Sequence, residues 1–252
     1  MEQRVTSGSV ELAVHVATPS TTGRTAPGPA VVLCHGFPTF GVGAADAAAT
    51  MPELADRMAL ELGWIAAAVA FRGAGASGGQ FSMGGWLSDI AAVVAHLAGL
   101  ETVGGVWLAG FGTGGAVAIC AAARDARIRG VAALGAPADF DDWASQPRRL
   151  LDHTRELGLV SDPAFPPSFD AWARDLKAFR AIECVRRLAP RPLLLVHGTD
   201  DESVPSIDSR AVADAHGSAE VRFLSGAHHQ LRHDPRAIAV LLGWLDRQRH
   251  AG

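Results

Sequence analysis

The chain has 252 residues, of which 48% are apolar and 19% are charged, with a formal net charge of −4 at pH 7. This length is enough to bury one large core, and the composition excludes disordered, collagen-like and coiled-coil classes. The 22 basic residues are scattered along an acidic chain. We therefore expect no nucleic-acid partner.

Cysteine usage and the N-terminal sequence bear on the compartment. The three cysteines, Cys34, Cys120 and Cys184, lie far apart with no CxxC pair, which is poor support for a disulfide or thiolate-metal framework. The first residues lead into an alternating segment instead of an apolar signal region, and no stretch reaches about 18 uninterrupted apolar residues. We expect a cytoplasmic protein that does not span a membrane.

Hydrophobic patterning predicts alternating strands and helices. Residues 10–16 alternate apolar and polar side chains, residues 20–29 are expected to form a surface loop, and short apolar runs bounded by Gly or Pro then recur. The predicted strands are 10–16, 30–34, 64–71, 105–109, 130–134, 192–196 and 219–224, and the predicted helices are 47–62, 86–100, 114–124, 207–216 and 235–249. Such alternation predicts an α/β fold with a mostly parallel sheet covered on both faces.

The regular alternation of predicted strands and helices is interrupted once, between residues 135 and 192. This segment of more than fifty residues is rich in aromatic residues and broken by proline. It is too long for one crossover and predicts a small helical lid over the carboxyl edge of the sheet. We therefore expect a core of residues 1–138 and 191–252 and a lid insertion of residues 139–190.

The segment GFGTGG at residues 110–115 follows a predicted strand and opens a predicted helix. Read as G-x-G-x-x-G, it is a dinucleotide fingerprint. Read as G-x-S-x-G without its serine, it is the nucleophile turn of a hydrolase. The same glycine pattern recurs at residues 73–78, and the next strand ends without an acidic residue to hold a ribose, so the dinucleotide interpretation is weak. We expect no cofactor.

Four further motifs follow predicted strands in chain order: HGFP at 35–38, RGAGAS at 72–77, HGTDDESVP at 197–205 and GAHH at 226–229. With GFGTGG, they resemble the α/β-hydrolase superfamily, specifically its small-lidded serine esterase-like members, from about residue 30 to the C-terminus. The resemblance implies an α/β-hydrolase fold: a mostly parallel central sheet of about eight strands flanked by helices, with a small helical lid between the sixth and seventh strands. It also implies a small acyl or ester-like ligand and a monomer or homodimer.

The resemblance assigns five site residues. It places the acid at Asp201, the base at His229, and the oxyanion-binding backbone N–H groups at Phe37 and Thr113. The position of the nucleophilic serine is occupied by Gly112. Since glycine has no side chain, covalent acyl-enzyme chemistry at that position is excluded.

Close neighbours of these residues are rivals for the same roles. Asp200 is the rival of Asp201 and has a turn-capping alternative, and His228 would be the base if the alignment slipped by one residue. His229 and His233 have the i,i+4 spacing of metal ligands on a helix. No HExxH motif or third ligand stands nearby, so we expect no metal site.

Other side chains near the motifs have structural interpretations. We expect Cys34 to be a buried core residue, Ser77 to cap a loop, and His35 to hold the HG turn by a hydrogen bond. The lid aromatics either line an apolar acyl pocket or pack the lid onto the sheet, and sequence does not choose between these; they are Trp143, Phe165, Phe169, Trp172 and Phe179. Of these, Trp143, Phe165 and Trp172 are the pocket candidates.

Three functions fit this pattern. The first is hydrolysis of an ester by a water molecule that the Asp201–His229 pair activates, slowly and without a covalent intermediate. The second is a binding or regulatory protein that keeps the pocket without the chemistry. The third is lyase, isomerase or oxygenase chemistry in which His229 removes a proton directly from the substrate.

Overall fold

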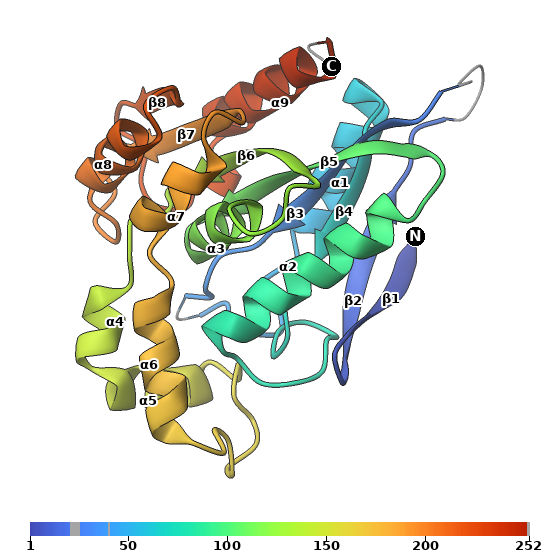
Figure 1. The fold of residues 1–252 in the computed structure, drawn as a ribbon. Helices are drawn as coiled ribbons and strands as arrows, with labels where there is room; N and C mark the ends of the chain where they lie inside the picture. Colours follow the sequence, from blue (N-terminus) through green and yellow to red (C-terminus); the bar gives the residue numbers. More distant parts are fainter. Residues whose placement is uncertain (21–25, 40, 251–252) are drawn as a thin grey trace.

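The computed structural model describes residues 1–20, 26–39 and 41–250. Its centre is an eight-stranded sheet in the order β1-β2-β4-β3-β5-β6-β7-β8 (Figure 1). The strands β1 and β2 form an antiparallel hairpin, β2 is antiparallel to β4, and all other neighbouring strands are parallel. The strand bounds are β1 Glu2–Ser7, β2 Val10–Ala17, β3 Gly28–Cys34, β4 Ile65–Val69, β5 Val103–Phe111, β6 Ile128–Leu134, β7 Leu193–Gly198 and β8 Glu220–Leu224.

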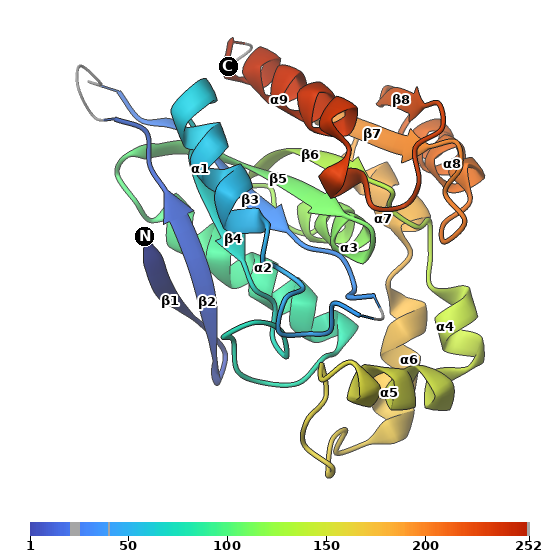
Figure 2. The ribbon, with the colours of Figure 1, turned by 180° about the vertical axis from the view of Figure 1, so that it is seen from behind.

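Helices cover both faces of the sheet, because its central strands are apolar on both sides; all five residues of β4 are buried. One face carries α1 (Met51–Leu62) and α9 (Pro235–His250), as Figures 1 and 2 show together. The other face carries α2 (Met83–Ala98), α3 (Thr113–Ala122), α7 (Ala181–Leu188) and α8 (Ser206–His216).

The segment between β6 and β7 projects from one end of the sheet as a group of helices (Figure 1). These are α4 (Asp141–Ser145), α5 (Pro147–Glu156) and α6 (Phe169–Ala178), while α7 lies against α3 and α8. The indole of Trp172 on α6 is 5% exposed, and its Nε1 donates to the Phe81 carbonyl at 3.2 Å. This contact joins the projecting helices to the loop before α2.

The predicted sheet of about eight mostly parallel strands, with helices on both faces and helices between the sixth and seventh strands, is confirmed. Strand β1 was not predicted, because this edge strand is mostly polar and lacks a core-facing apolar run. Helix α1 begins at Met51 and not at residue 47, since Pro52 lacks an N–H and fits only the first turn of a helix. Of the predicted loop 20–29, residues 21–25 lie outside the described residues, and β3 already begins at Gly28.

Within the described part of the chain, no helix is both long enough and apolar enough to cross a bilayer.

Candidate active site

The turn between β5 and α3 has the backbone of a nucleophile turn. Its central residue is Gly112, with φ 52° and ψ −125°. A positive φ of this kind strains residues with a side chain, whereas glycine adopts it readily. The N–H of Gly112 donates to the Leu134 carbonyl at 2.8 Å, which fastens the turn to the neighbouring strand β6.

The HGFP loop after β3 lies directly against this turn. A Cβ on Gly114 would collide with the carbonyl oxygen of His35, and the Cα of Gly36 lies 3.9 Å from the place where a Cβ on Gly112 would be. Thr113 is the first residue of α3, so its N–H has no acceptor within the helix. The HGFP loop, which contains Phe37, and the start of α3, where Thr113 lies, are therefore in contact.

His35 holds the HGFP loop in place, as expected from the sequence. Its Nε2 accepts from the N–H of Phe71 at 3.0 Å, so Nδ1 carries the proton and donates to the Gly36 carbonyl at 2.8 Å. Burial is the largest of the influences that lower the pKa of His35, to about 4, so the imidazole is neutral at pH 7. A neutral histidine can make both bonds at once.

Asp201 and His229 are in contact, although 28 positions separate them in sequence. The Oδ2 atom of Asp201 lies 2.9 Å from Nδ1 of His229. Because a carboxylate only accepts, the proton of a neutral His229 is on Nδ1, and Nε2 has a free lone pair. This Nε2 lies 3.3 Å from the position of a Cβ on Gly112. The imidazole thus presents a base to the space beside Gly112.

The carboxylate of Asp201 is fully buried but well supplied with donors. Its Oδ1 accepts from the N–H groups of Ser203 and Val204, both at 2.9 Å. Burial alone would raise the pKa of this carboxyl group; hydrogen bonds from His197, from His229 and from Val204 outweigh burial and hold the pKa well below its usual range. Asp201 is therefore ionised at neutral pH.

The residues considered as alternatives make other contacts. Asp200 is exposed and accepts from the Thr199 hydroxyl at 2.7 Å, and Nδ1 of His228 lies 3.0 Å from the Asp200 carbonyl oxygen. The Nε2 atom of His233 accepts from the Arg232 guanidinium at 2.9 Å. Among residues 1–20, 26–39 and 41–250, no three His, Cys, Asp or Glu side chains are grouped as ligands for a metal ion.

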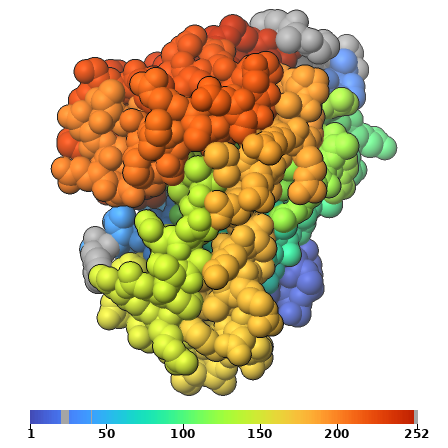
Figure 3. All heavy atoms as spheres, turned by 60° about the vertical axis from the view of Figure 1, so that its left-hand side comes forward, coloured from blue at the N-terminus to red at the C-terminus, as the bar shows by residue number. Residues whose placement is uncertain are grey.

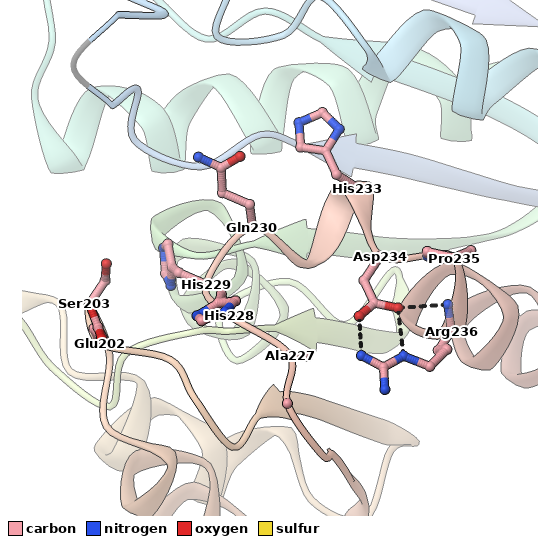
Figure 4. A pocket seen from close by; sticks show the side chains of 11 residues that line it. Glu202, Ser203, Ala227, His228, His229, Gln230, His233, Asp234, Pro235 and Arg236 are labelled. Atoms are coloured by element: carbon pink, nitrogen blue, oxygen red, sulfur yellow. Dashed lines mark hydrogen bonds and ion pairs between the residues drawn. The ribbon is translucent and has the colours of Figure 1, made fainter.

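A surface hollow of about 650 Å³ opens beside His229. Figure 4 shows that the loop after β7 supplies one wall and the loop after β8 supplies the other, with His229 between them. The space-filling view shows the surface hollowed between the C-terminal part of the molecule and helix α4 (Figure 3). The wall residues are mostly polar: Glu202, Ser203, Gly226, Ala227, His228, His229, Gln230, His233, Asp234, Pro235 and Arg236.

Comparison with solved structures shows what this architecture is similar to. Est1E from Butyrivibrio proteoclasticus is 20% identical, with a TM-score of 0.73 over 100% of this chain and 99% of that chain. The α/β hydrolase GrgF from Penicillium is 19% identical, with a TM-score of 0.74 over 100% and 98%. The chain has the α/β-hydrolase fold. A serine hydrolase without a lid from Xanthomonas campestris is 20% identical, with a TM-score of 0.63 over 98% and 92%.

No protein-family model and no curated protein sequence matches the chain. In the α/β-hydrolase fold the nucleophile occupies a strand-turn-helix element, and here β5, Gly112 and α3 form that element. The loops after β3, β5, β7 and β8 all meet at the carboxyl edge of the sheet.

None of the three predicted pocket aromatics, Trp143, Phe165 and Trp172, is among the residues that line the hollow beside His229. The Trp143 ring packs on the Phe37 ring with centroids 4.9 Å apart, next to the predicted oxyanion loop. Phe165 and Trp172 border a separate hollow along α6. Trp172 is almost completely buried, and its Nε1 donates to the Phe81 carbonyl. The structure thus associates only Trp143 with the predicted oxyanion residues.

The structural interpretations of Cys34 and Ser77 agree with their surroundings. Cys34 is fully buried, and burial raises the pKa of its thiol. The Ser77 hydroxyl donates to the Ala70 carbonyl at 2.6 Å and accepts from the Ala13 N–H at 2.8 Å. Neither side chain takes part in the site around Gly112.

Sequence reasoning gave no role to His197, although the HGTDDESVP motif contains it. His197 is fully buried, and its Nε2 lies 3.4 Å from the same oxygen of Asp201 that contacts His229. A histidine at the end of a buried strand, four residues before the predicted acid, was the signal available in the sequence.

Proposed function

We propose that the protein hydrolyses a small carboxylic ester or related acyl compound by direct attack of water. His229 acts as the general base and Asp201 fixes its tautomer. Gly112 stands where related serine hydrolases have their nucleophile, so no acyl-enzyme forms. One observation carries the proposal: Nε2 of His229 lies 3.3 Å from the Cβ position of Gly112, while Nδ1 lies 2.9 Å from Oδ2 of Asp201.

The proposed reaction takes place in two proton transfers. Water attacks the acyl carbon as its proton moves to Nε2 of His229, and the carbonyl oxygen becomes an oxyanion that the N–H groups of Phe37 and Thr113 stabilise. The imidazolium then gives its proton to the leaving alkoxide. One ester and one water give one acid and one alcohol. Loss of a serine nucleophile leaves a rate of about 10³–10⁴ over water in a protease, so we expect slow turnover.

The first substrates to assay are aryl-acyl esters. Est1E has been solved with ferulic acid bound. Here Phe37 and Trp143, which are both only partly buried, place aromatic surface at the predicted oxyanion loop, with ring centroids 4.9 Å apart. Such surface suits a flat aromatic acyl group.

The decisive assay runs the reaction in water enriched in oxygen-18. Hydrolysis by activated water gives an acid product with one labelled carboxyl oxygen and no burst, and His229→Ala abolishes turnover. Product formation without label would instead support direct proton abstraction from the substrate. Binding of the ester without any turnover, in the parent and in His229→Ala alike, would support a binding protein and overturn the proposal.

A further inference from the structure

Two histidines share one oxygen atom of the buried acid. The Oδ2 atom of Asp201 lies 2.9 Å from Nδ1 of His229 and 3.4 Å from Nε2 of His197. The side chains of Asp201 and His197 are fully buried, whereas the side chain of His229 is 28% exposed. His229 is thus the solvent-facing member of the group, and His197 is its interior member.

The protonation state of His197 follows from its neighbours. Its Nε2 also lies 3.0 Å from the carbonyl oxygen of Val204. Both neighbours of Nε2, a carbonyl and a carboxylate, are acceptors, so Nε2 carries a proton. Its hydrogen bond goes to the Val204 carbonyl, and the carboxylate oxygen of Asp201 lies 3.4 Å from the same nitrogen. The other ring nitrogen, Nδ1, lies 2.7 Å from the hydroxyl of Ser209 on α8, which donates to it in the neutral imidazole.

His197 therefore cross-links three elements around the acid. It stands near the end of β7, its Nδ1 is tied to α8, and its Nε2 is tied to the turn that carries Asp201. The two oxygens of Asp201 are then held differently: Oδ1 by backbone N–H groups of its own turn, and Oδ2 by two imidazoles. Among the residues that the structure describes, removal of His197 leaves Oδ2 with one donor, the partly exposed His229.

We propose that His197 is a positioning residue, which fixes the rotation of the Asp201 carboxylate and thereby orients His229 towards Gly112. The role of His229 as a base rests on the proposed function. The orientation of the Asp201–His229 hydrogen bond does not depend on the proposed function, because it is a property of the protein without substrate. Supporting groups of this kind act by holding the reacting group within a narrow range of geometry.

The test measures the Nδ1–H proton of His229 by NMR in protein labelled with nitrogen-15 at histidine, with His229→Gln to assign the signal. In His197→Leu, we expect solvent exchange of this proton to become about tenfold faster and the Nδ1–H tautomer to lose its dominance. In His197→Gln, the amide restores an N–H donor, and exchange should stay within about threefold of the parent.

A matched control separates this effect from the loss of any buried histidine. His216 is also buried; it is the last residue of α8, and its Nε2 lies 3.0 Å from the carbonyl oxygen of Arg191, which precedes β7 at the edge of the sheet opposite the site. His216→Leu should leave the His229 signal unchanged. If His197→Leu does not fold, Ser209→Ala decides: it removes the hydroxyl partner of His197, and we expect at least about threefold faster exchange.

If the protein hydrolyses esters as proposed, the kinetics of ester turnover give a second test of His197. His197→Leu should lower kcat about tenfold with little change in KM, since His197 lies behind the acid and does not face the hollow. An unchanged His229 signal in folded His197→Leu, or in Ser209→Ala if His197→Leu is unfolded, overturns the positioning role. If the parent protein shows no ester turnover but the His229 signal changes as expected in His197→Leu, the proposed function is overturned and the positioning role of His197 stands.

Discussion

The Nε2 atom of His229 lies 3.3 Å from the position that a Cβ atom would take on Gly112. The imidazole and the glycine are therefore arranged like the base and the nucleophilic residue of a serine hydrolase, but glycine carries no hydroxyl. Gly112 also relieves the backbone, because its φ of 52° is unfavourable for any other residue. The absence of a hydroxyl and the unstrained backbone both follow from glycine at this position.

Gly112→Ser is expected to create a covalent nucleophile. The new hydroxyl would lie within reach of His229, so the variant should react stoichiometrically with a fluorophosphonate and give a burst of product from an activated ester. The parent should take no label. Mass spectrometry of the intact protein measures the adduct.

The same substitution should cost stability. A residue with a side chain at this φ is strained by about 1–3 kcal/mol, and its Cβ would press on the His229 ring. Gly112→Ala is the matched control: urea denaturation should show a similar loss in both variants, while only Gly112→Ser takes the label. A labelled Gly112→Ala, or a labelled parent, would mean that another residue is the nucleophile.

Asp201→Asn is expected to disable the base. The amide can donate a proton to Nδ1, which favours the tautomer with its proton on Nε2, the nitrogen that faces Gly112. The corresponding change in a serine protease lowers kcat by about 10⁴, and we expect a fall of that order in ester turnover. Asp200→Asn is the control next to it, since Asp200 faces solvent and binds the Thr199 hydroxyl; its rate should stay near the parent rate. Equal losses in the two variants would contradict the assignment.

Asp201 should also affect how the stability of the folded protein changes at acid pH. Its pKa is held well below the unfolded value, which is near 4, so the ionised carboxylate stabilises the folded protein above about pH 4. This contribution is lost as the pH falls from about 4 through the folded pKa. Asp201→Asn should therefore lose less stability than the parent when urea midpoints are compared between about pH 5 and pH 3. If the variant loses as much stability as the parent between these pH values, the acid sensitivity is due to other carboxylates.

Much of this site could be predicted from the sequence because parallel strands end at one edge of a sheet. The motifs that follow β3, β5, β7 and β8 had to meet there once the strand pattern was read correctly. The contact between Asp201 and His229 is found in the structure. Their catalytic roles, and those of Phe37 and Thr113, stay predictions.

Features that depend on side-chain rotamers were beyond the sequence. The bond of His197 to Asp201 needs the ring of a buried strand residue to turn towards the following loop, and no spacing rule specifies that turn. In the same way, the sequence of an insertion does not show whether an aromatic side chain lines a pocket or packs against the core. Trp143 lies on Phe37, whereas Trp172 is buried against Phe81.

The RGAGAS loop depends on a buried ion pair, and this gives a prediction about stability alone. The carboxylate of Asp89 is fully buried and accepts from the Arg72 backbone N–H at 2.9 Å and from Nη2 of its guanidinium at 2.6 Å. Asp89→Ala removes the carboxylate that neutralises this guanidinium, which keeps its hydrogen bond to the Ser7 hydroxyl, and should cost about 3–5 kcal/mol. The Asp125–Arg127 pair has the same chemistry at the surface, so Asp125→Ala should cost no more than about 1 kcal/mol. Urea denaturation of both variants at pH 7 measures the difference, and similar losses would show that burial does not set the strength of the pair.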